Sequence, residues 1–348
     1  MAERTLTNQE LNRALLARQL LLERAKLPIP QALERVGGIQ AQYAPSMYVG
    51  LWSRLAGFRR GSLTRALERR TVAQGTLMRV TIHLVSARDF LVLAEGVRDQ
   101  RRAWWLRAHG RRADERKIAA AAKKARSLLV QGPRRRSKLA EELGADSVTW
   151  NGIGMWLDLV RVPPSGTWEQ RRADLYALAG DWLGESEATT EQGLELLVRR
   201  YLGGFGPGSL KDLANWAGLP VAPFKPILEK MKLRRFRDEQ GGELLDLPRA
   251  PLPDPGTPAP VRFLPVWDAT LLAHARRTQI LPEQYRARVF STKTPQSVNT
   301  FLVDGRVAGT WKYERGQVVV EPFERLARDV RREVDEEAER LTDFHSAG

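Results

Sequence analysis

The chain has 348 residues, of which 43% are hydrophobic and 28% charged, and its formal net charge at neutral pH is +15. This length and composition predict a globular protein with a large core, and no apolar run is long enough to span a bilayer. The chain has no cysteine, which excludes disulfides and cysteine-ligated metal centres. Its four histidines are not spaced as metal ligands, and no glycine-rich phosphate loop is present. We therefore expect neither a metal nor a nucleotide cofactor.

The positive charge predicts a polyanionic partner, because an excess of this size attracts nucleic acid or anionic membrane. Nucleic acid is favoured, because no single stretch forms a basic amphipathic helix with an exposed apolar face. We therefore expect a cytoplasmic, nucleoid-associated protein that binds DNA and not membrane.

The first predicted unit covers residues 1–110. Its opening helix begins with Thr7 and Glu10 in the spacing of a capping box, further helices are expected over roughly 45–70, and paired strands around 73–85. In the intervening segment VGGIQAQYAPS, Gln40 and Gln42 stand one residue apart after a glycine pair. Side chains alternate across an extended chain, so the two amides share one side there, whereas on a helix they diverge by about 200°.

Two further units repeat the order of three helices followed by a hairpin. Residues 111–185 contain the helical segments DERKIAAAAKKARSLLV, RRSKLAEELG and SVTWNGIGMWLDLV, and then a hairpin with a Pro-Ser-Gly turn. Residues 186–250 are the clearest copy and end in the hairpin RRFRDEQGGELLDLP. Three helices and a two-stranded ribbon describe a winged helix, which places a helix in the major groove and a wing against phosphates.

The C-terminal segment, 251–348, begins with a proline-rich linker and contains the hairpin NTFLVDGRVAGTWKY, in which Asp304 and Gly305 form a strong two-residue turn signal. A terminal helix closes the chain. The predicted fold is therefore α+β and mainly helical, with three tandem winged-helix units around a concave basic DNA-binding surface. We expect a monomer, because three fused units already supply an extended surface.

Four segments together resemble the winged-helix DNA glycosylases typified by AlkZ: GIQAQYAPSMYVGLWSR, TLMRVTIHLVSARDF, FLPVWDATLLAHARR and FLVDGRVAGTW. Members of that family unhook crosslinks and remove bulky alkylated bases, notably in bacteria that make DNA-alkylating antibiotics. The resemblance implies that Gln40 and Gln42 form the catalytic motif of glutamine, aliphatic residue, glutamine. It also implies resistance to a DNA-alkylating natural product, and it places the threonine–histidine pair of the family on Thr81 and His83.

Other residues are candidates for DNA contact, each with a structural alternative. Trp267 and Asp268 can both face the DNA. The favoured alternative is that Trp267 lies in the core and that Asp268 caps the following helix. Four more arginine or histidine positions suit phosphate contacts but also suit ordinary surface or packing roles; these are His274 with Arg277, and the pair Arg134 and Arg135.

Two neutral amides suit the removal of a purine alkylated at N7 or N3. Such a base already carries a positive charge and leaves without being protonated, so the protein needs only to position water at the sugar. A glutamine amide offers two donors and an acceptor without a net charge. We therefore predict a monofunctional DNA glycosylase that acts on duplex DNA containing alkylated purines. A winged-helix transcription regulator and a protein-interaction scaffold are the alternatives, and neither gives a reason for the glutamine pair.

Overall fold

The computed structural model describes residues 4–275, 277–290 and 297–347. Helices account for 50% of the residues and strands for 17%, so the prediction of a mixed, mainly helical fold is confirmed. Within the described residues, no helix combines the length and apolarity needed to cross a bilayer.

The helices are α1 (Asn8–Arg18), α2 (Ile29–Val36), α3 (Ala44–Arg54), α4 (Arg60–Glu68), α5 (Ala87–His109), α6 (Glu115–Leu129), α7 (Arg136–Leu143), α8 (Ser147–Trp156), α9 (Ala179–Leu183), α10 (Thr190–Phe205), α11 (Leu210–Ala217), α12 (Lys225–Lys230), α13 (Arg286–Val289) and α14 (Arg328–Ser346). The strands are β1 (Ile39–Gln40), β2 (Val72–Thr76), β3 (Ile82–Ser86), β4 (Arg134–Arg135), β5 (Leu159–Arg161), β6 (Leu175–Leu178), β7 (Arg234–Arg237), β8 (Glu243–Asp246), β9 (Arg262–Leu264), β10 (Thr300–Val303), β11 (Arg306–Glu314) and β12 (Gln317–Pro322). Most of these elements lie where the sequence predicts them, including the capping box of Thr7 and Glu10 at the start of α1.

A six-stranded antiparallel sheet in the order β1-β3-β2-β5-β6-β4 organises the centre of the molecule. In the middle of this sheet β2 pairs with β5, and there Gln74 lies opposite Arg161 and Gly75 opposite Val160. The strands of the first two predicted units therefore form one continuous sheet. The limits of the three units and their winged-helix character stay predictions.

Helices α5 and α10 cross in close contact beside this sheet. A Cβ atom added to Gly193 would lie 2.4 Å from the backbone nitrogen of Gly96, so only glycines permit this approach. The main hydrophobic core contains Phe90, Val160 and Tyr201, each of which is almost completely buried. This core fixes α5 and α10 against the sheet and thereby sets the position of β2 and β3.

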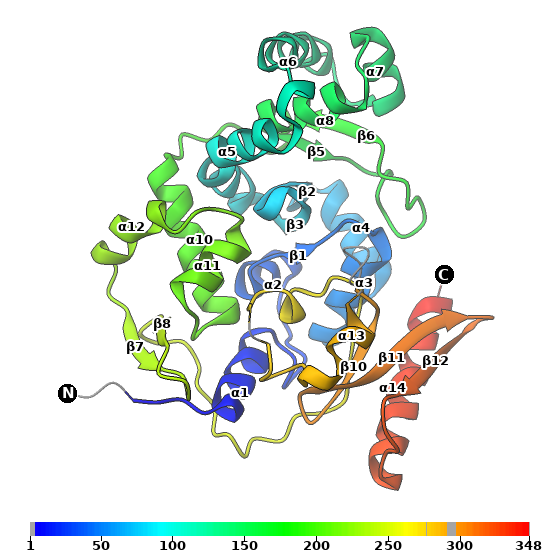
Figure 1. Ribbon diagram of the computed structural model, residues 1–348. Coiled ribbons are helices and arrows are strands. Elements are labelled where there is room, and N and C mark those ends of the chain that lie inside the picture. The colour runs from blue at the N-terminus through cyan, green and yellow to red at the C-terminus, as the bar shows by residue number, and fades with distance from the viewer. Residues whose placement is uncertain (1–3, 276, 291–296, 348) are drawn as a thin grey trace.

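The third predicted unit and the C-terminal segment follow their expected order. Helices α10, α11 and α12 precede the β7–β8 hairpin, and β9 to β12 form a second antiparallel sheet in the order β12-β11-β10-β9. Asp304 and Gly305 both have positive φ, of 43° and 76°, so the predicted two-residue turn joins β10 to β11. Helix α14 packs along β12 (Figure 1).

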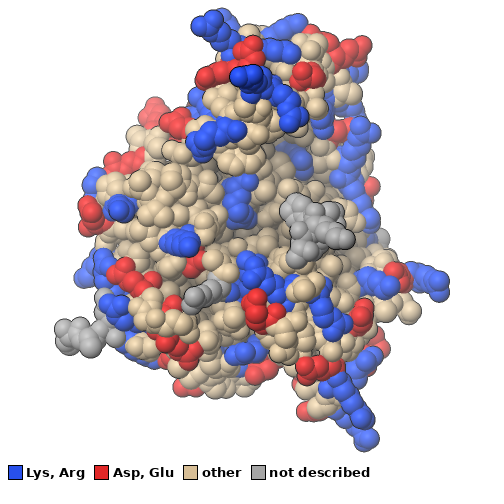
Figure 2. Space-filling model, viewed as in Figure 1, with Lys and Arg blue, Asp and Glu red and all other residues tan. Residues whose placement is uncertain are grey.

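Helices α6, α7 and α8 form a lobe at one end of the molecule, next to β5 and β6, and the remaining elements form a broader body (Figure 1). Lysine and arginine side chains are spread over this lobe and over the body beneath it (Figure 2). The long connection between β5 and β6 reaches from the lobe towards α3 and α4. Strand β1, which carries Gln40, lies in the body, and β3 and β2 separate it from β5 in the sheet (Figure 1).

Candidate active site

The predicted catalytic glutamines lie at the edge of the six-stranded sheet. Strand β1 pairs with β3 so that Gln40 faces His83, and the next backbone N–H, that of Ala41, donates to the Ile82 carbonyl at 2.7 Å. Gly38 has a φ of 81°, and a Cβ atom added there would lie 2.8 Å from the Val85 side chain. The glycine before the motif is therefore required for β1 to approach β3 this closely.

Gln40 and Gln42 point to the same side, as their extended spacing predicts. The side-chain nitrogen Nε2 of Gln40 donates a hydrogen bond to Oε1 of Gln42. Gln40 is buried, with 7% of its surface exposed, whereas Gln42 is exposed. Since Gln42 follows the last residue of β1, the inner amide is held by the sheet and the outer amide is presented to solvent.

Arg79 completes this amide network, and the sequence analysis does not identify it. Its guanidinium donates through Nη2 to Oε1 of Gln40 at 3.2 Å and through Nη1 to the Trp216 carbonyl at 2.6 Å. Arg79 has a φ of 52° in the tight turn between β2 and β3. Burial lowers the pKa of Arg79 to about 10, so the group remains a cation at neutral pH. Because the Arg79 cation binds Oε1 of Gln40, the side-chain amide of Gln40 is oriented with its Nε2 towards Gln42.

His83 lies directly behind the pair as a neutral imidazole. Its Nδ1 is 3.0 Å from the Thr81 carbonyl, so Nδ1 carries the proton and Nε2 is left as the acceptor. Burial lowers the pKa of His83 to about 3, and the charge of Arg79 acts in the same direction. The hydroxyl of Thr81 donates to the Met78 carbonyl at 3.0 Å. The two residues are close together, as the predicted hairpin requires, and both brace the turn that holds Arg79.

Asp268 and Trp267 lie in a structural network. Both carboxylate oxygens of Asp268 accept from the Arg54 guanidinium, at 2.9 and 2.8 Å, and both side chains are buried. Asp268 also caps the short helix Ala269–Leu271 by accepting from the Thr270 N–H at 3.1 Å. Trp267 is half-buried and donates its backbone N–H to Ser297 at 2.7 Å. The capping interpretation of Asp268 is therefore confirmed.

The other predicted DNA contacts have internal partners. His274 is buried and lies 3.1 Å from the Phe205 carbonyl through Nε2, and Arg277 donates to the Leu271 carbonyl at 2.7 Å. Arg134 pairs with Glu142 at 3.0 Å, and Arg135 pairs with Asp174 at 2.9 Å. The hydrogen bonds of the described residues join none of the four to the glutamines. Contacts between these side chains and DNA stay predictions.

The loop between β5 and β6 brings two further residues to the motif. Trp168 anchors this loop by packing edge-on against Tyr48 of α3 and Phe344 of α14, with ring centroids 5.6 Å apart in both pairs. As a result, Nη1 of Arg171 lies 3.3 Å from the hydroxyl of Tyr43, which follows Gln42 directly and is 44% exposed. In the sequence, the position of Tyr43 directly after Gln42 is the single feature that points to this contact between Tyr43 and Arg171.

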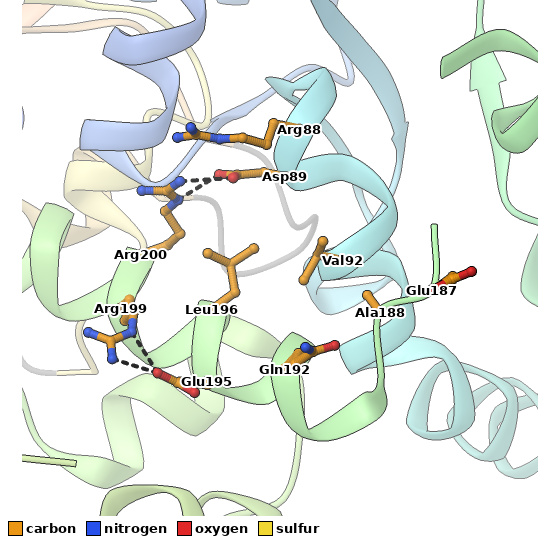
Figure 3. Close-up of a pocket in the computed structure, with 10 residues that line it drawn as sticks. All are labelled: Arg88, Asp89, Val92, Glu187, Ala188, Gln192, Glu195, Leu196, Arg199 and Arg200. Atoms are coloured by element: carbon orange, nitrogen blue, oxygen red, sulfur yellow. Dashed lines mark hydrogen bonds and ion pairs between the residues drawn. The ribbon is translucent and has the colours of Figure 1, made fainter. Parts of the chain in front are cut away.

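A broad cleft of about 700 Å³ lies elsewhere, between α5 and α10 (Figure 3). Two of its arginines pair with carboxylates of the same cleft: Arg200 donates to Asp89 at 2.6 and 2.8 Å, and Arg199 donates to Glu195. None of the predicted site residues lines this cleft. In the part of the chain that the structure describes, no group of three or more His, Asp or Glu side chains is placed to bind a metal ion.

Comparison with known proteins identifies the family. Residues 33–344 match the family described as DNA glycosylase AlkZ-like. A curated relative from Streptomyces sahachiroi, named interstrand DNA cross-link repair glycosylase, is 22% identical over 361 aligned residues that cover 92% of each chain. The solved structure of Streptomyces sahachiroi DNA glycosylase AlkZ has the same fold, with a TM-score of 0.81 at 19% identity over 98% of this chain and 97% of that chain. The chain therefore belongs to the AlkZ-like family of DNA glycosylases.

Proposed function

We propose that this protein is a monofunctional glycosylase that hydrolyses the N-glycosidic bond of cationic N7- or N3-alkylated purines in duplex DNA, including bulky adducts and interstrand crosslinks. The observation that carries the proposal is the pair of hydrogen-bonded amides, one buried and one exposed, at the edge of the six-stranded sheet. The name of the curated relative, which refers to cross-link repair, supports the same substrate class.

In the proposed reaction, the bond between C1′ and the purine nitrogen breaks and its electron pair neutralises the cationic base. Water then forms the new bond to C1′, loses a proton to solvent and leaves an abasic site. Because the leaving group carries its own charge, no general acid is needed, unlike in most sugar hydrolases. The enzyme contributes the position and orientation of the water, which is worth several kcal/mol.

The structure supports different roles for the two amides. Gln42 is exposed, and Oε1 of its side chain keeps a second lone pair that can accept a hydrogen bond from the attacking water. Gln40 is buried between Arg79 and Gln42, so it acts as a positioning residue. The polarised chain from Arg79 through Gln40 fixes the Gln42 amide in one orientation, and such chains strengthen each member's hydrogen bonds.

We further propose that Gln42 approaches the sugar from the minor groove, because a crosslinked base is tied to both strands and cannot leave the stack freely. Tyr43 and Arg171 then face the same stretch of duplex, with the aromatic ring against the bases and the guanidinium against a phosphate. The protein works as a monomer in this proposal, and it protects its host against a DNA-alkylating natural product.

The test uses duplex DNA that contains N7-methylguanine or an interstrand crosslink at one site. The wild-type protein, without added metal, should release the base and leave alkali-sensitive strand breaks. Gln42→Ala should abolish most of this activity, Gln40→Ala should reduce it less, and the exposed Gln31→Ala on α2 serves as the matched control. Tight duplex binding without base release by the wild-type protein would instead identify a DNA-binding regulator.

A further inference from the structure

A second, smaller cleft lies on the opposite face of the six-stranded sheet from Gln40. Directly opposite residues in antiparallel strands share a face, so Gln40 and His83 belong to one face of the sheet. Arg161 lies opposite Tyr176, and Arg161 follows Val160, which shares the face of His83 through Gly75; Arg161 and Tyr176 therefore belong to the other face. Ile82 directly precedes His83 and belongs to that other face as well. Arg161, Tyr176 and Ile82 line a cleft of about 210 Å³, hereafter the aromatic cleft.

The aromatic cleft and the glutamine pair share one structural element. Arg79 and Val80 are consecutive in the tight turn between β2 and β3. Arg79 reaches Gln40 on one side of this turn, whereas Val80 lines the aromatic cleft. The two sites are therefore separated by the thickness of one hairpin, and a group attached to the reacting nucleotide can extend from one site to the other.

The walls of the aromatic cleft suit a flat ring. Trp105 and Trp150 are both 6% exposed, and Trp150 meets Tyr176 edge-on with ring centroids 5.7 Å apart. The cleft is smaller than the roughly 300–1,000 Å³ pockets that bury drug-sized ligands, so it accommodates a single ring system. Stacking of a planar heteroaromatic group on such side chains needs no particular base sequence.

Two side chains in the walls of the aromatic cleft have donors without acceptors. Among the described residues, none accepts a hydrogen bond from the indole N–H of Trp105 or from Nε of Arg161, and both atoms are buried. Arg161 also forms no ion pair with any described residue, whereas Arg101, which donates to the carbonyl of the cleft residue Thr76 at 3.0 Å, pairs with Asp158 at 2.8 Å. The guanidinium of Arg161 is only half-buried, so it can donate to an acceptor that a ligand brings into the cleft.

We propose that the aromatic cleft binds a planar aromatic group that carries a hydrogen-bond acceptor and is part of the DNA substrate. Two sources share this chemistry, namely the aromatic portion of a bulky adduct and an extrahelical base. In both, the ring lies against Trp105 and Trp150 and its acceptor meets Arg161. This inference rests on the proposed glycosylase function and extends it to the selection of bulky lesions.

A blocking variant tests the proposal without loss of packing. Gly154 of α8 lines the cleft, and a Cβ atom added there meets nothing within 4 Å. Gly154→Leu therefore fills the cleft, and leucine also favours the helix. Ser127→Leu, on the exposed side of α6 in the same lobe, is the matched control, and Arg161→Gln removes the unpaired cation without affecting an internal partner.

Base release is measured on two duplexes, one with N7-methylguanine and one in which guanine N7 carries a naphthamide. Slower release of the naphthamide adduct alone, by about tenfold in Gly154→Leu and less in Arg161→Gln, assigns the aromatic cleft to the adduct. Slower release of both bases assigns it to an extrahelical base. Release unchanged from both duplexes in both variants overturns the proposal.

The affinity for DNA separates this inference from the proposed function. If the wild-type protein releases neither base, the proposed function fails. The proposal for the aromatic cleft is then tested by the affinities of the protein for the two kinds of duplex. Preferential binding of the naphthamide duplex over the unmodified duplex, lost in Gly154→Leu and kept in Ser127→Leu, would still support the cleft. Equal affinity of the wild-type protein for the two duplexes would overturn it.

Discussion

Replacement of His83 by asparagine should remove a pH-dependent component of stability. His83 is 3% exposed and lies between Gln40 on β1 and Gly75 on β2. Its Nδ1–H donates to the Thr81 carbonyl, and the amide nitrogen of an asparagine can take over this hydrogen bond. His83→Asn therefore keeps the local contact and removes the titration.

The magnitude follows from the shifted pKa of His83. Burial lowers the pKa from 6.5 to about 3, so protons bind the unfolded chain more tightly than the folded one. The stability linked to the neutral ring is complete above pH 6.5 and is lost as the pH falls towards 3. With these two values, the loss between neutral pH and about pH 4.5 is about 3 kcal/mol.

Urea unfolding of the wild-type protein and His83→Asn, each at about pH 7.5 and about pH 4.5, measures this component. The other titrating groups are common to both proteins, so their contributions cancel in the comparison. The wild-type protein should lose about 3 kcal/mol more than the variant between the two conditions. An equal loss in both proteins would show that His83 is not held as a neutral, desolvated ring, and the account of the turn behind Gln40 would be wrong.

Three further predictions concern the site and its support. Arg79→Met should lower kcat for base release by about tenfold or more while KM changes little, because it frees the Gln40 amide; Arg35→Met on the exposed side of α2 should have no such effect. Asp268→Ala should lower the free energy of unfolding by about 3–5 kcal/mol, because it leaves Arg54 buried and unpaired, and an Arg54→Met/Asp268→Leu double variant should recover most of the loss. Affinity for undamaged duplex should fall by about 1,000-fold or more between about 50 and about 200 mM salt, as measured by fluorescence anisotropy, and a flat salt dependence would contradict phosphate binding by this charged surface.

Features that depend only on neighbouring residues could be predicted from the amino-acid sequence. The capping box of Thr7 and Glu10 and the turn at Asp304 and Gly305 follow from local backbone chemistry, and both are present. The spacing of Gln40 and Gln42 likewise predicted that their amides share a side, because alternation along an extended chain is a local property. The family resemblance rested on such short segments, and the match over residues 33–344 confirms it.

Contacts between residues far apart in the chain depend on the packing of the folded protein and could not be predicted from the sequence. The pairing of β2 with β5 joins two predicted units into one sheet, and the turn between β2 and β3 carries Arg79 to Gln40 across 39 positions of sequence. Asp268 had two open interpretations until its burial against Arg54 was seen. Contacts of this kind depend on how whole elements pack, and no local periodicity records which donor will reach which acceptor or which aromatic side chains will enclose a cleft.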